Sequence, residues 1–146
     1  MPDTKLDQYK SYLLDMSAVG TRYSTANGFY LSVLTALVGI LALTEGSKPL
    51  GQMRLGVVIG VPLVAISICW IWYRTISFYK KLFAIKLSVL RQLEADLSAR
   101  PFDEERKASA HLEPLTKNES RVPVVIGVLF GAVALTAGLL RLLGKA

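Results

Sequence analysis

Three long runs of uncharged, mostly apolar residues set the strongest limit on what this chain can fold into. They cover Tyr23 to Thr44, Leu55 to Tyr73 and Val122 to Leu140, and none of them contains Asp, Glu, Lys, Arg or His. As an α-helix rising about 1.5 Å per residue, each run is long enough to cross the roughly 30 Å hydrocarbon core of a bilayer. The sequence therefore predicts an all-α integral membrane protein with three transmembrane helices.

The composition excludes several other classes of protein. Hydrophobic residues make up 52% of the 146 residues, which is too many for an intrinsically disordered chain. The single cysteine, Cys69, excludes a secreted domain held together by disulfides. The residues outside the three runs are divided among four segments, so they cannot build a large soluble core.

The basic residues indicate how the chain is oriented in the membrane. Thirteen of the 17 Lys and Arg residues lie in residues 1–22 and 74–121, and four lie in 45–54 and 141–146. The positive-inside rule therefore predicts a cytoplasmic N-terminus and an exterior C-terminus. Because the charge follows this topology, the net charge of +6 does not indicate a nucleic-acid partner. The first run is longer than the core of a signal peptide, so we expect no cleavage.

These patterns divide the chain into seven segments. They are a cytoplasmic amphipathic helix (1–22), a transmembrane helix (23–44), an exterior loop (45–54), a second transmembrane helix (55–73), a cytoplasmic helical extension and connector (74–121), a third transmembrane helix (122–140) and an exterior tail (141–146). The amphipathic helix has an apolar stripe from Leu6 to Tyr23. Its polar face mixes acidic and basic residues, which is poor for anionic lipid, so we expect the stripe to pack on protein.

The second run is expected to continue into the cytoplasm as one helix. Neither Gly nor Pro occurs between Arg74 and Leu97, and the apolar residues there approximate a heptad seam. Its main members are Tyr79, Leu82, Lys86, Val89 and Leu93. A bare amphipathic helix or an isolated helical hairpin buries little surface, so several copies of these helices are expected to form a bundle and a cytoplasmic helical layer.

Pairs of glycines at GxxxG spacing are further candidates for helix packing. Gly56 and Gly60 lie in the second run, and Gly127 and Gly131 lie in the third. Small residues at this spacing let helix backbones approach closely in lipid. The spacing is compatible both with packing inside one chain and with packing between chains.

Residues that could carry catalysis or bind a metal are scarce. His111 is the single histidine, Cys69 lies inside an apolar run, and no zinc, phosphate-loop or nucleophile motif occurs. The acidic residues at 103–105, beside Arg106 and Lys107, have the pattern of a solvated helix face with local ion pairs. We therefore expect no enzyme activity, no cofactor and no metal.

Polar and aromatic residues mark the expected inner boundary of the membrane. They are Arg22, Asn27, Tyr30, Trp70, Trp72 and Arg74. Aromatic rings with one wet edge are favoured at headgroup depth, and the two arginines can meet lipid phosphates or helix carbonyls, or can act as simple anchors. An amide at the hydrocarbon edge needs a partner, so Asn27 is expected to bond to a neighbouring helix.

Part of this sequence resembles a known family. The residues concerned are Tyr9 and Tyr12, the segment Thr21 to Ser32 with its Arg22 and Ala26-Asn27, and the stretch from Trp72 to Glu94. Together they are similar to the RipA family of small bacterial octameric inner-membrane proteins. The resemblance implies a homo-octamer in the bacterial cytoplasmic membrane that acts in envelope function or adaptation to a host.

Two classes of function are compatible with these features. The first is a homo-oligomeric structural or interaction assembly, which the length and regularity of the helical extension favour. The second is an oligomeric pore or a membrane-permeabilising effector, for which hydroxyls such as Ser32 and Thr35 could line a path. The sequence favours the assembly, because no ring of charge or strongly polar stripe marks a route for ions.

Overall fold

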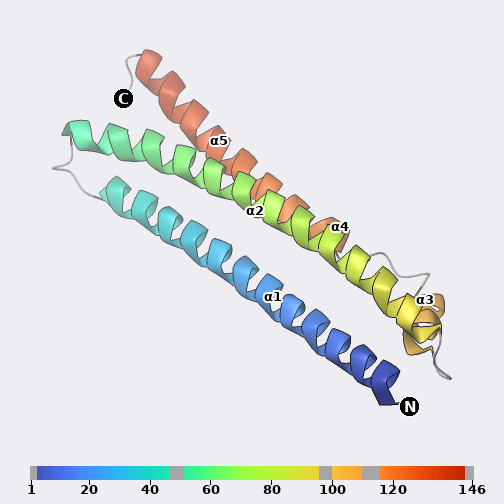
Figure 1. Cartoon of the computed structure of the whole chain (residues 1–146). Helices are drawn as coiled ribbons and strands as arrows, with labels where there is room; N and C mark the ends of the chain where they lie inside the picture. Colours follow the sequence, from blue (N-terminus) through green and yellow to red (C-terminus); the bar gives the residue numbers. More distant parts are fainter. Residues whose placement is uncertain (1–2, 47–50, 96–99, 110–115, 144–146) are drawn as a thin grey trace.

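Two helices of 44 residues each form the frame of the computed structural model (Figure 1). The structure describes residues 3–46, 51–95, 100–109 and 116–143. Helix α1 covers Asp3–Gly46 and α2 covers Gly51–Glu94. The three helices that follow are α3 (Pro101–Ser109), α4 (Thr116–Glu119) and α5 (Arg121–Leu142). The predicted all-α class is confirmed.

Helix α1 joins the expected amphipathic helix and the first transmembrane helix into one rod. No proline interrupts residues 3–46, and several hydroxyl side chains bond to carbonyls of their own helix, as Thr25 Oγ1 does to the Thr21 carbonyl at 3.0 Å. Helix α2 likewise runs unbroken through Pro62 and out of the apolar run to Glu94. The expected end at Leu97 lies outside the described residues.

The boundaries of the connecting segments differ from the predicted ones. Helices α1 and α2 take up both ends of the expected 45–54 loop, since α1 reaches Gly46 and α2 begins at Gly51. The remainder of that loop, residues 47–50, lies outside the described residues. Pro101 begins α3, because proline is well suited to the first turn of a helix, where its missing N–H is not needed. His111 and residues 144–146 of the expected tail also lie outside the described residues.

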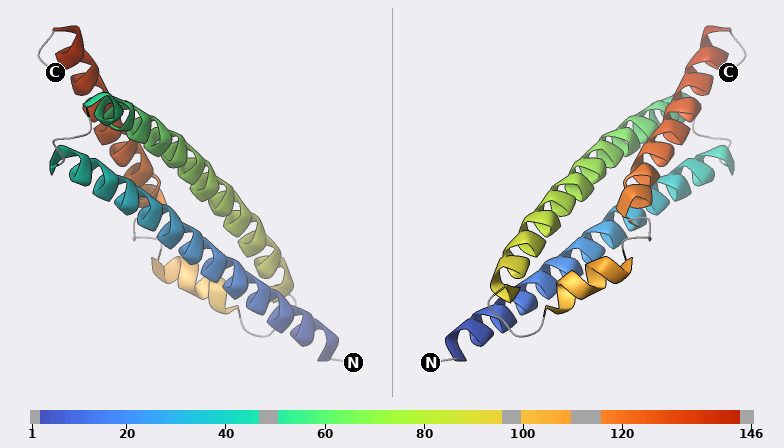
Figure 2. Two further views of the ribbon diagram at one scale, coloured as in Figure 1. Left: turned by 90° about the vertical axis from the view of Figure 1, so that its left-hand side faces the viewer. Right: turned by 90° about the vertical axis from the view of Figure 1, so that its right-hand side faces the viewer.

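The long helices are arranged around α2. Helix α1 packs antiparallel to one side of α2, and α5 packs on α2 as well, whereas α4 contacts the beginning of α5 (Figure 1). Figure 2 shows that the short α3 lies toward the end of the molecule that holds the N-terminus, and that α5 runs toward the opposite end. Helices α1, α2 and α5 are each long and apolar enough to cross a membrane.

Much of α1 and α2 extends beyond any hydrocarbon layer. A helix of 44 residues is about 66 Å long, roughly twice the thickness of a bilayer core. The uncharged runs occupy the half of each helix that lies nearer to residues 47–50 in the sequence. We call the other half, residues 4–22 of α1 and 74–94 of α2, the polar half of the hairpin.

The core lies where the three long helices meet. Its buried members are Leu34 of α1, Ala65, Cys69, Trp72 and Ile76 of α2, and Phe130 of α5. Gly127 belongs to this contact, because a Cβ atom there would lie 3.5 Å from Cys69 Cβ. At Gly56, Gly60 and Gly131 an added Cβ would have no neighbour within 4 Å among the described residues, so these glycines bring no helices together inside the chain.

We expect truncation of Leu90 to destabilise the fold. Leu90 lies in the polar half of α2 and is 0% exposed, so Leu90→Ala leaves a cavity that costs about 2–5 kcal/mol. The control is Leu135→Ala on α5, where the side chain is 68% exposed. Thermal unfolding in mild detergent should show a clear fall in Tm for Leu90→Ala and little change for Leu135→Ala. Equal effects would contradict the assigned core.

Candidate functional site

A series of polar and aromatic contacts joins α1 to α2 along the polar half of the hairpin and into the membrane boundary. The contacts run from Tyr9 with Glu94 at one end to Tyr30 with Thr75 at the other. We call this series the seam. Residues nearer the end of α1 contact residues nearer the start of α2, so the seam fixes one antiparallel register.

The boundary end of the seam is built around Trp72. Its indole N–H donates a hydrogen bond of 2.7 Å to Asn27 Oδ1, which gives the Asn27 amide a partner on the neighbouring helix. Tyr30 stacks on the Trp72 ring with centroids 6.0 Å apart, and its hydroxyl lies 3.1 Å from Thr75 Oγ1. Trp72 is therefore buried in the core rather than facing lipid, whereas Trp70 is exposed.

Tyr23 is the point at which three elements meet. Its ring packs against Tyr79 and Phe83 of α2, with centroids 5.3 and 6.3 Å away. Its hydroxyl donates a hydrogen bond of 2.6 Å to Glu119 Oε2 of α4. Since α4 leads directly into α5, this bond ties the start of the third long helix to the hairpin.

Further into the polar half, a charged pair crosses the seam. The Lys86 ammonium forms an ion pair with Asp15 and lies 4.9 Å from the centre of the Tyr12 ring. Tyr79 and Lys86, two of the residues expected to pack between helices, thus contact α1 of their own chain. The other three, Leu82, Val89 and Leu93, are half-buried.

The far end of the seam holds a buried carboxylate, Glu94. Its Oε1 accepts hydrogen bonds from the Tyr9 hydroxyl and from the Phe102 backbone N–H, both at 3.1 Å. The second bond caps the first turn of α3, so Glu94 joins three helices. Burial and the neighbouring Glu94 carboxylate raise the pKa of the Tyr9 hydroxyl above its ordinary value. The charge pattern of the sequence gives no sign of this role.

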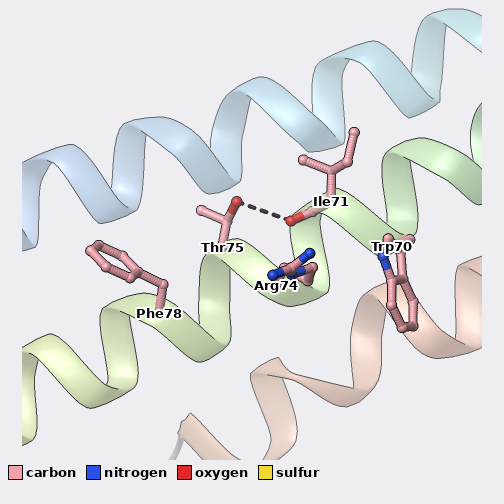
Figure 3. Close-up of a pocket in the computed structure, with 5 residues that line it drawn as sticks. All are labelled: Trp70, Ile71, Arg74, Thr75 and Phe78. Carbon is pink, nitrogen blue, oxygen red and sulfur yellow. Dashed lines mark hydrogen bonds between the residues drawn. The ribbon is translucent and has the colours of Figure 1, made fainter.

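Two grooves lie on outward faces of the hairpin. One, of about 430 Å³, lies on α2 and is lined by Trp70, Ile71, Arg74, Thr75 and Phe78. Figure 3 shows Ile71 and Thr75 on the side toward α1 and Trp70 on the side toward α5, with Arg74 pointing out between them. The second groove, also about 430 Å³, lies on α1 and is lined by Thr21, Arg22, Thr25, Ala26, Phe29 and Tyr30.

Each groove contains one of the boundary arginines. Arg22 and Arg74 are exposed, and neither has an ion pair or a side-chain hydrogen bond within the part of the chain that the structure describes. Their guanidinium groups are therefore available to anions or to other polar groups outside this chain. Within the same described ranges, no group of three His, Cys, Asp or Glu residues could hold a metal ion.

The fold and the seam define a helical membrane protein in which α1 and α2 stay paired beyond their uncharged runs. The chain matches the octameric membrane protein family (8xMP) over residues 6–140, and it belongs to that family. The match confirms the resemblance to a family of small octameric membrane proteins, although it does not carry the name RipA. No match is found among curated proteins or among solved structures.

We expect the bond between Asn27 and Trp72 to stabilise the hairpin. Asn27→Leu leaves the buried indole N–H without its acceptor, which costs about 1–3 kcal/mol. In a Trp72→Phe background the same change should cost less, because no donor is left unpaired. Tm values of the two single variants and the double variant measure the coupling, and Asn118→Leu at an exposed position of α4 is the control. Strictly additive effects would contradict the prediction.

Proposed function

We propose that this protein is a non-enzymatic, homo-oligomeric assembly in the bacterial inner membrane, with a structural or interaction role that includes envelope function. Family membership supports self-association, and one feature of the surface carries the rest of the proposal. In the polar half of the hairpin, Leu14, Phe78 and Ile85 are 73%, 63% and 61% exposed. Phe78 and Ile85 are seven residues apart and share one face of α2, so they form an apolar stripe beyond the uncharged run, which supports protein contact there.

The seam supports an assembly with a defined shape. Its hydrogen bonds and ring contacts hold the polar half of α1 against that of α2 in one register. A hairpin fixed in this way can present the same outward surface in every copy. This is what a symmetric homo-oligomer requires, because identical copies must offer identical faces.

The alternative function, a pore or membrane-permeabilising effector, has weaker support. The hydroxyls of Ser32, Thr35 and Ser67 each donate to a carbonyl one turn earlier in their own helix, at 2.9, 2.9 and 3.0 Å. Such hydroxyls are satisfied without water, so they do not by themselves form a polar path. The pore is the second candidate function, and a measurement of ion conductance distinguishes it from the assembly.

We propose that the N-terminus and α3 lie in the cytoplasm and that the C-terminus lies outside. The bias of basic residues toward 1–22 and 74–121 supports this orientation. Reporter fusions after Gly46, Ser109 and Ala146 should give exterior, cytoplasmic and exterior signals, respectively. A cytoplasmic signal at Gly46 or Ala146, or an exterior signal at Ser109, would reverse or overturn the topology.

We expect the purified protein to be an oligomer of fixed size that conducts no ions. Native mass spectrometry in mild detergent should give one stoichiometry, with eight copies as the expectation from the family. Reconstitution into planar bilayers should give no steady current. A monomer would contradict the proposed assembly, and a conductance that changes with Ser32→Ala or Thr35→Ala would favour the pore.

A further inference from the structure

We propose that neighbouring copies dock head to tail, with an apolar ridge on α2 of one copy seated in the outward groove on α1 of the next. The ridge consists of Ile71, Phe78 and Ile85, of which Ile71 and Phe78 also line the groove around Arg74. The groove, which we call the α1 hollow, is the one lined by Thr21, Arg22, Thr25, Ala26, Phe29 and Tyr30. This inference rests on the proposed homo-oligomer and names the surfaces that form its repeated contact.

The ridge is a regular stripe that no part of its own chain covers among the described residues. Its three members are spaced seven residues apart, so they lie on one face of α2, and they are 52%, 63% and 61% exposed. The seam uses a different face, which includes Trp72, Tyr79 and Lys86. Ridge and seam therefore point in different directions from the same helix.

The α1 hollow has the shape of a receptor for such a ridge. Three of its six lining side chains, those of Thr21, Thr25 and Ala26, are short, and the other three, those of Arg22, Phe29 and Tyr30, are long. Toward the N-terminus of α1, Leu14 and Ala18 are exposed as well, and their spacing places them on the same face of the helix as Thr21 and Thr25. A bulky side chain from another molecule can thus enter between larger residues, as a knob enters a hole.

The register of the seam places ridge and hollow at the same height. The Tyr79 ring contacts Tyr23, which lies between the lining residues of the hollow in the sequence. Phe78 is next to Tyr79, so it lies level with the middle of the hollow. Ile85 precedes Lys86, which pairs with Asp15, so Ile85 lies level with Leu14 and Ala18. Copies of one membrane protein cross the bilayer at the same depth. Side by side, they therefore bring Phe78 of one copy to the hollow of the next.

A head-to-tail contact of this kind suits a ring. The ridge and the hollow are different surfaces on different helices, so the contact is heterologous and closes into a ring when the rotation between copies allows it.

The chain exposes 10600 Å², whereas a compact monomer of 16.0 kDa would expose roughly 7,400 Å². The difference between these two areas exceeds the roughly 1,600 Å² that one chain contributes to two standard interfaces, so the chain exposes enough surface for a neighbour on each side.

A second copy fits this surface better than lipid does. Ile85 lies eleven residues beyond Arg74, which is about 16 Å along the helix, and Leu14 lies eight residues before Arg22, about 12 Å. At these distances, Ile85 of the ridge and Leu14 beside the hollow lie outside the hydrocarbon core. Acyl chains can cover Ile71, but the exposed side chain of Ile85 needs a protein partner.

Cysteine cross-linking in native membranes tests the proposed contact. In a Cys69→Ala background, which removes the single native thiol, the pair Phe78→Cys and Thr25→Cys should give a ladder of covalent multimers after oxidation or a short bismaleimide linker. The pair Ile85→Cys and Ala18→Cys should do the same. The control pair is Phe78→Cys and Leu14→Cys. These two positions lie on the same two helix faces but at different heights along the helices, so they should give no ladder of multimers.

Two further measurements separate the possible outcomes. Phe78→Cys alone should not form covalent dimers, because a dimer from this single site would indicate a two-fold contact and overturn the head-to-tail arrangement. Native mass spectrometry of the same samples gives the copy number. An intact oligomer without a ladder from either matched pair would overturn this inference but leave the proposed assembly standing, whereas a monomer would overturn both.

A substitution provides an independent test of the ridge. Phe78→Asp should shift the protein from oligomer to monomer, whereas Phe83→Leu inside the seam should leave the copy number unchanged. Circular dichroism shows whether the monomeric variant keeps its helices. If the oligomer persists in Phe78→Asp while phospholipid bound per chain falls, the groove around Arg74 is a lipid site and the proposed contact is wrong.

Discussion

The register between α1 and α2 is the constraint on which the rest of this structure depends. Inside a bilayer, large apolar side chains add little to the register, because lipid tails cover them as well as another helix does. The bond from the Trp72 indole to Asn27 can, since only one pairing of the two helices satisfies both groups. From that point the contacts of Tyr23 and of Lys86 extend the same pairing along the polar half.

The sequence predicts much of the fold but less of the seam. Long uncharged runs identify the three helices that are apolar enough to cross a membrane, and the absence of Gly and Pro after Arg74 identifies the continuous extension of α2. Both patterns reflect local backbone preferences, which a sequence records directly. Which helix face meets which neighbour depends on tertiary packing. For this reason Trp72 can be expected at the membrane boundary, yet its inward direction follows only from the position of Asn27.

The heptad pattern in α2 illustrates the same limit. It predicts residues that pack against another helix after the second uncharged run, but it cannot say whether the partner is α1 of the same chain or another copy. The structure assigns Tyr79 and Lys86 to α1 of the same chain, and it leaves Phe78 and Ile85 on an outward face. Glu94 is a stronger example. A buried carboxylate that caps α3 has no signature in spacing or hydropathy, because the carboxylate and its two donors come from three separate segments.

The position of α5 adds a last consequence for assembly. Because α5 packs on α2 and hardly meets α1, it covers one side of α2 and leaves the membrane half of α1 open. Gly127 is used in this packing, whereas Gly131, Gly56 and Gly60 face no neighbour among the described residues. A chain built this way has different surfaces on its two outer helices. In the head-to-tail contact proposed above, copies meet through unlike surfaces, and such a contact closes into a ring only when the rotation between copies allows it.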